Sequence, residues 1–112
     1  MNARGQVYLW AAQRISAVLL AFCVCVHLVT LIYAVRGGLS AAEILARTHA
    51  SVGWATFYAV FVLAVAVHAP IGLRTILVEW LGWRGPALQI VTVLVALTIA
   101  VLGLRAVWAV IA

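Results

Sequence analysis

Three long apolar stretches, separated by two short polar segments, dominate the pattern of residues along the chain. They cover residues 12–35, 51–72 and 87–111 approximately, and each exceeds the roughly 20 residues that a helix needs to cross about 30 Å of hydrocarbon. The chain shows no internal repeat and no linker. The pattern therefore predicts an all-α integral membrane protein, with three transmembrane helices in one domain that covers residues 1–112.

The two polar segments indicate how the apolar stretches are connected. The first stretch is expected to end at residues 36–38, because an arginine and two glycines break an apolar helix. Ser40 and Glu43 have the spacing of a capping box, which predicts a short interfacial helix over residues 40–48 between the first two spans. Residues 81–86 are predicted to form a loop whose proline suits the first turn of the third helix.

The composition supports a membrane location. The chain is 69% hydrophobic and 8% charged, whereas a soluble domain is about 45–50% apolar and about 25% charged. All seven basic residues are arginines, and they are scattered near the ends of the apolar stretches, where they can face lipid headgroups. No basic cluster or nucleic-acid-binding motif occurs, so no nucleic-acid partner is expected. The first stretch is longer than the about 7–15 apolar residues of a signal peptide, so it is expected to be retained.

The distribution of arginines indicates an orientation. Four lie near the N-terminus or in the second loop, and three lie in the first loop or near the C-terminus. This small excess favours an N-terminus on the inner side of the membrane. The expected location of the protein is a bacterial inner membrane. The first group contains Arg4, Arg14, Arg74 and Arg84, and the second contains Arg36, Arg47 and Arg105.

The segment H-A-P-I-G-L-R-T-I-L-V-E-W, which begins at His68, holds the candidate chemistry. An ionisable residue at membrane depth is a functional hypothesis by default, and a neutral imidazole is a suitable ligand for haem iron. Gly72 lies one turn later on the same face, where a missing side chain would let a flat macrocycle approach. Pro70 is expected to kink the helix. A histidine that makes a hydrogen bond to a neighbouring helix explains the same residue without a cofactor.

The other two histidines cannot complete a haem site with His68. His49 lies about 28 Å from His68 along a helix axis. The predicted spans put His27 about 22 Å from the inner end of the first helix, whereas His68 lies about 6 Å from the inner end of the second. A second axial ligand would therefore come from another chain. His27 shares a helix face with Ser16 and Cys23, so it is expected to face protein. There it could bind a second haem or make an interhelical hydrogen bond.

A quinone site is the second hypothesis. Arg14 and Ser16 could provide hydrogen bonds to quinone carbonyl oxygens, because the long arginine side chain can bend to the mouth of the helix. Glu79 could supply a proton, and Trp80 could supply an apolar wall. Alternatively, Arg14 is an ordinary interfacial anchor and Trp80 belongs to an aromatic belt.

These motifs resemble the membrane anchors of succinate dehydrogenase and fumarate reductase, the succinate:quinone oxidoreductases. The second-helix signature of the smaller cytochrome b anchor is close to His68-Ala69-x-Ile71-Gly72-Leu73 followed by Leu77-x-Glu79-Trp80. Gly72-Leu73-Arg74 resembles a Gly-Ile-Arg of the larger anchor, and Arg14-Ile15-Ser16 resembles its Arg-x-Ser near the quinone. The chain departs from the pattern at Gln13, Glu79 and Trp80, where the family usually has His, Asp and Tyr. Which of the two anchors it resembles more therefore stays open.

The resemblance covers nearly the whole chain and implies a function. His68 would give one axial ligand to a haem b that is shared with a second membrane-anchor subunit, and His27 is reminiscent of anchors with two haems. Electrons would pass between an iron–sulfur subunit and a quinone bound near Arg14, Ser16, Glu79 and Trp80. A flavoprotein subunit would carry the catalytic chemistry, so this chain would be an electron-transfer subunit of a respiratory complex and not an enzyme by itself.

Two other classes of membrane protein fit parts of the sequence. A small multidrug-type transporter has a similar length, but it needs a carboxylate inside a spanning helix. Glu43 and Glu79 both lie outside the predicted spans, and three spans are predicted instead of four. A cofactor-free assembly protein would explain the composition, but it would not explain the ordered set of histidine, glycine, arginine and glutamate.

Overall fold

Residues 2–112, which the computed structural model describes, form four helices and no strand. They are α1 (Ala3–Arg36), α2 (Ala41–Thr48), α3 (Val52–Leu81) and α4 (Pro86–Ile111). The helices α1, α3 and α4 are each long and apolar enough to cross a membrane. The predicted all-α fold, with three spans and a short helix between the first two, is confirmed.

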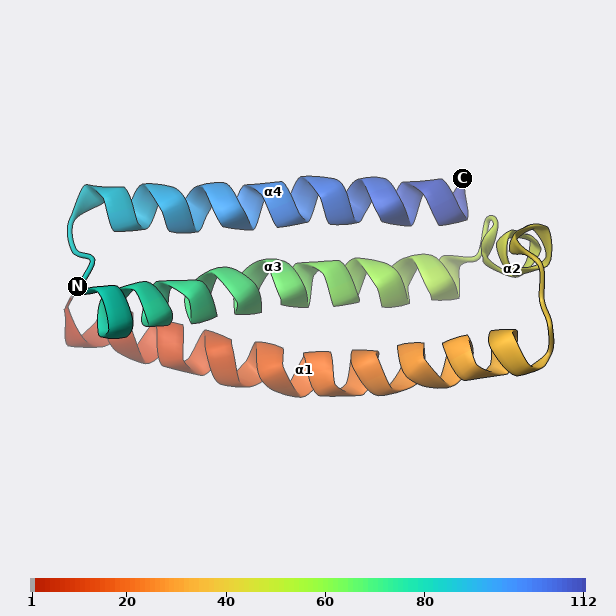
Figure 1. The fold of residues 1–112 in the computed structure, drawn as a ribbon, viewed down its shortest axis with the longest axis horizontal. Coiled ribbons are helices and arrows are strands. Elements are labelled where there is room, and N and C mark those ends of the chain that lie inside the picture. The colour runs from red at the N-terminus through yellow and green to blue at the C-terminus, as the bar shows by residue number, and fades with distance from the viewer. Residues whose placement is uncertain (1) are drawn as a thin grey trace.

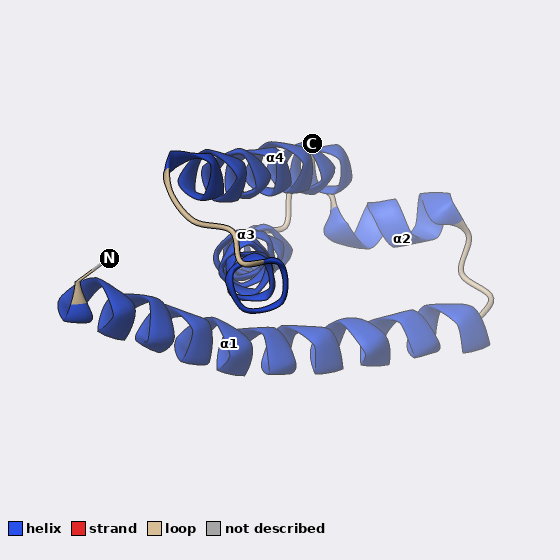
Figure 2. Ribbon diagram, turned by 60° about the vertical axis from the view of Figure 1, so that its left-hand side comes forward, coloured by secondary structure: helices blue, strands red, loops and turns tan. Residues whose placement is uncertain are grey.

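The three long helices lie side by side, with α3 between α1 and α4 (Figure 1). The N-terminus and the α3–α4 loop lie at one end of the bundle, and α2 and the C-terminus lie at the other. A second view shows α3 almost end-on, with the concave side of the curved α1 facing it (Figure 2). Because α1 and α4 make few contacts with each other, the bundle has two main seams, α1–α3 and α3–α4.

Two of the helices extend beyond the predicted spans. α1 begins at Ala3 instead of residue 12, where the Asn2 side chain accepts a hydrogen bond from the Gly5 N–H at 2.8 Å and caps the helix. α3 continues through Pro70 to Leu81 instead of ending at residue 72. The hydropathy pattern marks only the part of a helix that lies in hydrocarbon, whereas hydrogen bonding and caps decide where the helix ends.

Small side chains allow the helices to pack closely. Ser16 and Cys23, 4% and 2% exposed, are the buried residues of α1, which confirms that their stripe faces protein. Ala64 of α3 is 5% exposed. In the other seam, a Cβ added to Gly103 would lie 2.5 Å from Cγ1 of Val62, so α4 can approach α3 at this point only because the residue is a glycine.

The short helix α2 is anchored to the end of α4. Its predicted capping box is present, since Ser40 Oγ accepts from the Glu43 N–H and the Glu43 carboxylate accepts from the Ser40 N–H. The Thr48 hydroxyl donates to the carbonyl oxygen of Val110 at 2.7 Å, and the Ala50 N–H donates to that of Ile111 at 2.8 Å. Carbonyl groups in the last turn of a helix lack intrahelical partners. These two bonds supply partners for the last two carbonyl groups of α4, and they hold α2 against the end of that helix.

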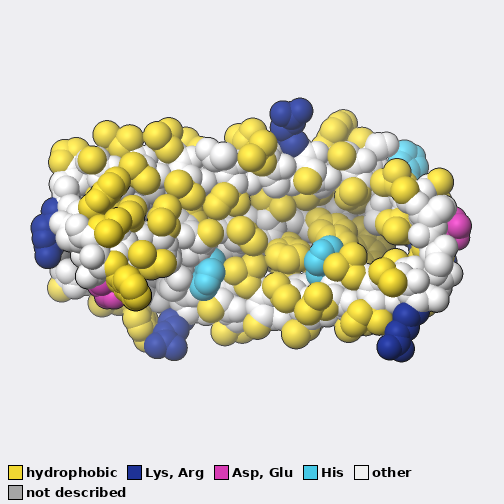
Figure 3. All heavy atoms as spheres, viewed as in Figure 1, with side chains coloured by type: hydrophobic (Ala, Val, Ile, Leu, Met, Phe, Trp, Pro, Cys, Tyr) yellow, Lys and Arg dark blue, Asp and Glu magenta, His cyan; other side chains and the backbone are white. Residues whose placement is uncertain are grey.

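The outer surface of the bundle is apolar. Large side chains such as Val18 and Phe22 of α1 and Leu97 of α4 are 72%, 65% and 57% exposed. The space-filling view shows hydrophobic side chains over most of one face, with the acidic side chains at the two ends of the molecule (Figure 3). Such a surface requires lipid or other membrane helices around it.

Candidate functional site

Ser16 of α1 and His68 of α3 meet in the seam between the two helices. The Ser16 Oγ lies 3.3 Å from His68 Nδ1 and 3.1 Å from the carbonyl oxygen of Gln13. A serine hydroxyl has one proton to donate. The Gln13 carbonyl can only accept this proton, so in the tautomer that carries hydrogen on Nδ1, Ser16 Oγ accepts from His68. This tautomer leaves the Nε2 lone pair of His68 free for a ligand.

The hydrogen bond between helices that was one explanation for His68 is therefore present. It does not compete with ligation, because it uses Nδ1 and leaves Nε2 available. His68 is half-buried, and it lies among apolar and small residues of the seam, including the buried Ala64 one turn earlier.

Gly72 and Gln13 complete a polar cluster with Ser16 and His68, which we call the α1–α3 polar cluster. A Cβ added to Gly72 would lie 3.4 Å from the Gln13 side-chain nitrogen, so this glycine faces α1 and the amide of Gln13 lies beside it. The side-chain oxygen of Gln13 is buried, and it has no hydrogen-bond partner among residues 2–112. The cluster thus contains an acceptor whose hydrogen bonding is incomplete.

His27 lies further along the same seam, and its surroundings differ. Its ring packs edge-on against Tyr58 and Phe61, with centroids 6.0 and 5.7 Å away. Its Nδ1 is buried and has no hydrogen-bond partner within the described part of the chain, so the expected interhelical hydrogen bond is not formed. His27 also lines a shallow apolar groove of about 280 Å³ that reaches Gly103 of α4.

The two seam histidines lie at different depths. His27 follows Ser16, the partner of His68, by eleven residues, which is about 16 Å along a helix. His27 contacts Tyr58 and Phe61 of α3, and His68 contacts Ser16 of α1, so both imidazoles lie in the seam between these helices. The predicted distance of His68 from its helix end, about 6 Å, is wrong, because α3 continues thirteen residues to Leu81, about 20 Å. The inference that one chain cannot provide both ligands is unchanged.

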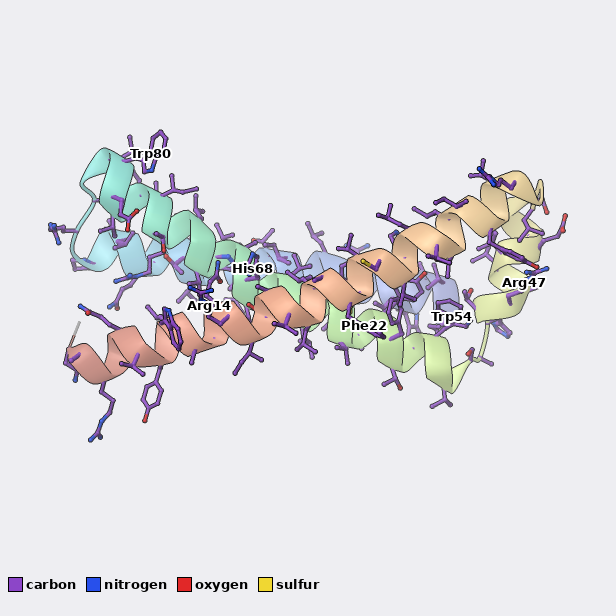
Figure 4. All side chains as sticks on the ribbon, turned by 90° about the horizontal axis from the view of Figure 1, so that it is seen from below. Arg14, Phe22, Arg47, Trp54, His68 and Trp80 are labelled. Carbon is purple, nitrogen blue, oxygen red and sulfur yellow. The ribbon has the colours of Figure 1, made fainter. Side chains whose placement is uncertain are left out.

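The four residues suggested for quinone binding do not form one site within this chain. Arg14 is exposed, and its guanidinium lies 5.5 Å above the ring of Trp10, whereas Ser16 is turned into the seam. Trp80 is 81% exposed, and Figure 4 shows it far from Arg14 and His68, pointing away from the bundle.

Glu79 lies in a different environment from Arg14 and Ser16. It lines an open polar pocket of about 720 Å³ at the end of the bundle that holds the α3–α4 loop, together with Arg74 and Arg84. No local motif in the sequence predicts this pocket, because its two arginines and its two glutamines, Gln6 and Gln89, are spread over three helices and a loop.

A comparison with protein families identifies the chain. A family model described as the succinate dehydrogenase/fumarate reductase transmembrane subunit matches residues 1–105. The chain belongs to this family. No match was found among curated proteins or among solved structures.

Membership of this family confirms the resemblance that the motifs suggested. The chain is a membrane-anchor subunit of succinate dehydrogenase or fumarate reductase, and so it is an integral membrane subunit of an oxidoreductase complex that has catalytic partner subunits. This assignment replaces the transporter and the assembly protein as explanations. No group of three or more His, Cys, Asp or Glu side chains suited to a metal ion occurs within residues 2–112.

Proposed function

We propose that this anchor subunit binds haem b through Nε2 of His68 and passes electrons between an iron–sulfur subunit and a membrane quinone. The observation that carries the proposal is the contact between Ser16 Oγ and His68 Nδ1 at 3.3 Å. Metal-bound histidines almost always donate their other ring N–H to a fixed acceptor, which sets the tautomer and the ring orientation. Ser16 supplies such an acceptor for His68.

The surroundings of His68 also fit a haem. Gly72 has no side chain one turn away, and the half-buried imidazole lies one turn from the buried Ala64. The buried amide oxygen of Gln13, on the facing helix, can accept a further hydrogen bond. Haem b, when bound, supplies one-electron transfer within the membrane. The contribution of this chain is to present an imidazole that is held by Ser16.

His68 fits this role better than His27. The Nδ1 of His27 has no hydrogen-bond acceptor among the described residues, so nothing fixes its tautomer. His27 remains our candidate ligand for a second haem, because its imidazole lies in the same seam beside an apolar groove.

The second axial ligand would come from a second anchor subunit. His27 lies about 16 Å along α1 from the level of His68, and His49 is exposed beyond the end of α2, at one end of the bundle. A second anchor would pack against the exposed apolar side chains of the bundle, such as Val18 and Phe22. Iron–sulfur and flavoprotein subunits would then attach at the membrane surface.

A quinone site near Arg14, Ser16, Glu79 and Trp80 is the second part of the proposal. The exposed guanidinium of Arg14 would donate to a quinone carbonyl, and the hydroxyl of Ser16 lies two residues later on the seam side of α1. Glu79 would exchange protons with the quinone, and Trp80 would form an apolar wall. Since these side chains lie apart in this chain, partner subunits must complete the site.

The orientation belongs to the same proposal. The N-terminus and the α3–α4 loop lie at one end of the bundle, and four of the seven arginines lie in or near these segments. We place this end on the inner side of a bacterial cytoplasmic membrane, where the catalytic subunits would bind.

The haem assignment can be tested in the assembled complex with His68→Leu and a control, His49→Leu, because His49 is exposed at the end of α2. Reduced-minus-oxidised spectra of purified complexes should lose the bands of this haem b in His68→Leu and keep them in His49→Leu. Activity of the flavoprotein subunit with an artificial electron acceptor shows that both complexes are assembled. Bands of full intensity in the His68→Leu complex would refute the assignment.

A further inference from the structure

A second cleft lies at the end of the bundle that holds α2, remote from the polar pocket at Glu79. It has a volume of about 230 Å³ and opens where α1, α2 and α3 meet. Figure 4 shows Arg47 of α2 and Trp54 of α3 at this junction. Side chains from all three helices and from the α1–α2 loop line it, namely Thr30, Leu31, Tyr33, Ala34, Leu39, Ile44, Arg47, Thr48, Trp54 and Tyr58.

The interior of this cleft is a hydrocarbon and aromatic surface. Its two threonines use their hydroxyl groups internally, since Thr30 donates to the carbonyl oxygen of His27 at 2.8 Å and Thr48 donates to that of Val110 at 2.7 Å. The rings of Trp54 and Tyr58 stack at 5.6 Å and form one wall. A ligand for this interior needs an apolar part that packs against these aromatic rings.

Arg47 adds one unpaired positive charge to the cleft. Its guanidinium lies 5.5 Å above the ring of Tyr33, a cation–π contact that fixes its position. Glu43, one turn earlier on α2, is engaged in the capping box, with its carboxylate 3.1 Å from Ser40 Oγ. Within residues 2–112, Arg47 makes no salt bridge, so its charge is available to an anion.

We propose that this cleft binds an anionic phospholipid, with one acyl chain in the apolar interior and the phosphate on Arg47. α2 is a short amphipathic helix at the end of the bundle, the position of an interfacial helix at headgroup depth. Arginine binds phosphate through two parallel hydrogen bonds, and a net-anionic headgroup is favoured because the cleft carries a cation and no acid. This inference does not depend on the haem or the quinone assignment.

Bound lipid would join α2 to the two long helices. The chain's own links from α2 to the bundle run mainly to α4, through Thr48 and Ala50. An acyl chain between Ala34 of α1 and Trp54 of α3 would fill the remaining side of the junction.

The proposal can be tested by tryptophan quenching with brominated lipids, using the full chain in nanodiscs. Trp54 lines the cleft, and its emission is isolated by subtracting the signal of Trp54→Phe. Phosphatidylglycerol with brominated acyl chains should quench this component at a lower lipid fraction than brominated phosphatidylcholine does. Arg47→Gln should raise the fraction of phosphatidylglycerol that gives half-maximal quenching about tenfold, because one charge-assisted interaction is lost.

Matched variants separate a specific site from general attraction. Arg36→Gln removes the same charge at the same end of the bundle, outside the cleft lining, and should leave quenching unchanged. Ala34→Leu fills the cleft and should abolish the preferential quenching, which keeps the test decisive if Arg47→Gln does not fold. Ala21→Leu, on an exposed part of α1, is its control and should leave the preferential quenching unchanged.

Three results would overturn the proposal. Equal quenching by the two brominated phospholipids would show that the cleft does not select an anion. An equal loss in Arg36→Gln and Arg47→Gln would show only bulk electrostatic attraction. Strong quenching by a brominated free fatty acid, together with none by phosphatidylglycerol, would identify a carboxylate amphiphile instead of a phospholipid.

Discussion

The hydroxyl oxygen of Ser16 lies 3.3 Å from Nδ1 of His68, and this contact joins α1 to α3 in the seam between them. Ser16 is 4% exposed, so neither water nor lipid replaces it as a partner. The contact fixes one nitrogen of the imidazole and leaves the other free. One serine thereby connects the packing of the bundle to the chemistry proposed for the anchor subunit.

Ser16→Ala should weaken haem binding without preventing assembly of the complex. Loss of such an outer partner typically costs about 10–100-fold in metal affinity, and His68 would no longer be held in one tautomer. We expect a lower haem-to-protein ratio, a shifted midpoint potential and a changed low-spin resonance signal. Ser16→Thr retains the hydroxyl and should restore all three. Wild-type values in Ser16→Ala would show that the hydroxyl does not act on the ligand.

Gly103→Ala should destabilise the α3–α4 seam. The added Cβ would lie 2.5 Å from Cγ1 of Val62 and 3.0 Å from its Cγ2, and overpacking of this kind costs about 1–3 kcal/mol. Thermal unfolding of the full chain in detergent should show a lower midpoint. Val62→Ala in the same chain should recover much of the loss.

A glycine with open surroundings provides the control for Gly103. A Cβ at Gly53 would meet only Ser51 Oγ, at 3.9 Å, so Gly53→Ala should not lower the midpoint. If both alanine variants unfold at the same temperature, close packing at Gly103 is not what supports the seam.

Thr48→Val should loosen α2 from the end of α4. The substitution keeps the shape of the side chain and removes the hydroxyl that donates to the Val110 carbonyl at 2.7 Å, leaving a helix-end carbonyl without its partner. A loss of about 1–3 kcal/mol is expected, together with faster amide exchange over residues 40–51.

Thr56→Val is the matched control for Thr48. The Thr56 hydroxyl bonds only to the carbonyl of Val52 in its own helix, and it is exposed, so its removal should leave exchange in α2 unchanged. Equal exchange in the two valine variants would mean that the bond to Val110 does not hold α2.

Much of the fold could be predicted from local patterns. The apolar stretches predicted the three spans, because each helix must satisfy its own backbone in hydrocarbon. The spacing of Ser40 and Glu43 predicted the cap of α2, and helical periodicity put Ser16 and Cys23 on the face that packs against protein. α1 and α3 continue beyond the predicted spans, because hydropathy does not report how far a helix extends outside the hydrocarbon.

The candidate site depended on information that local patterns do not contain. Ser16 and His68 are 52 residues apart, and spacing alone assigned one to a quinone and the other to a haem. The predicted spans placed Arg14, Glu79 and Trp80 near the same end of the bundle. In the structure each of these side chains has different surroundings, because the rotation of a helix about its axis decides where its side chains point.

The sequence by itself determined that this protein is a three-span membrane anchor of its family, because the length of each apolar stretch and the short motifs along it are local properties of the chain. The tertiary structure alone decided that α3 lies between α1 and α4, that Ser16 contacts His68, and that Arg47 lies beside an apolar cleft. These features depend on how whole helices tilt, rotate and pack, and that is set by the sum of many weak contacts between residues distant in the chain.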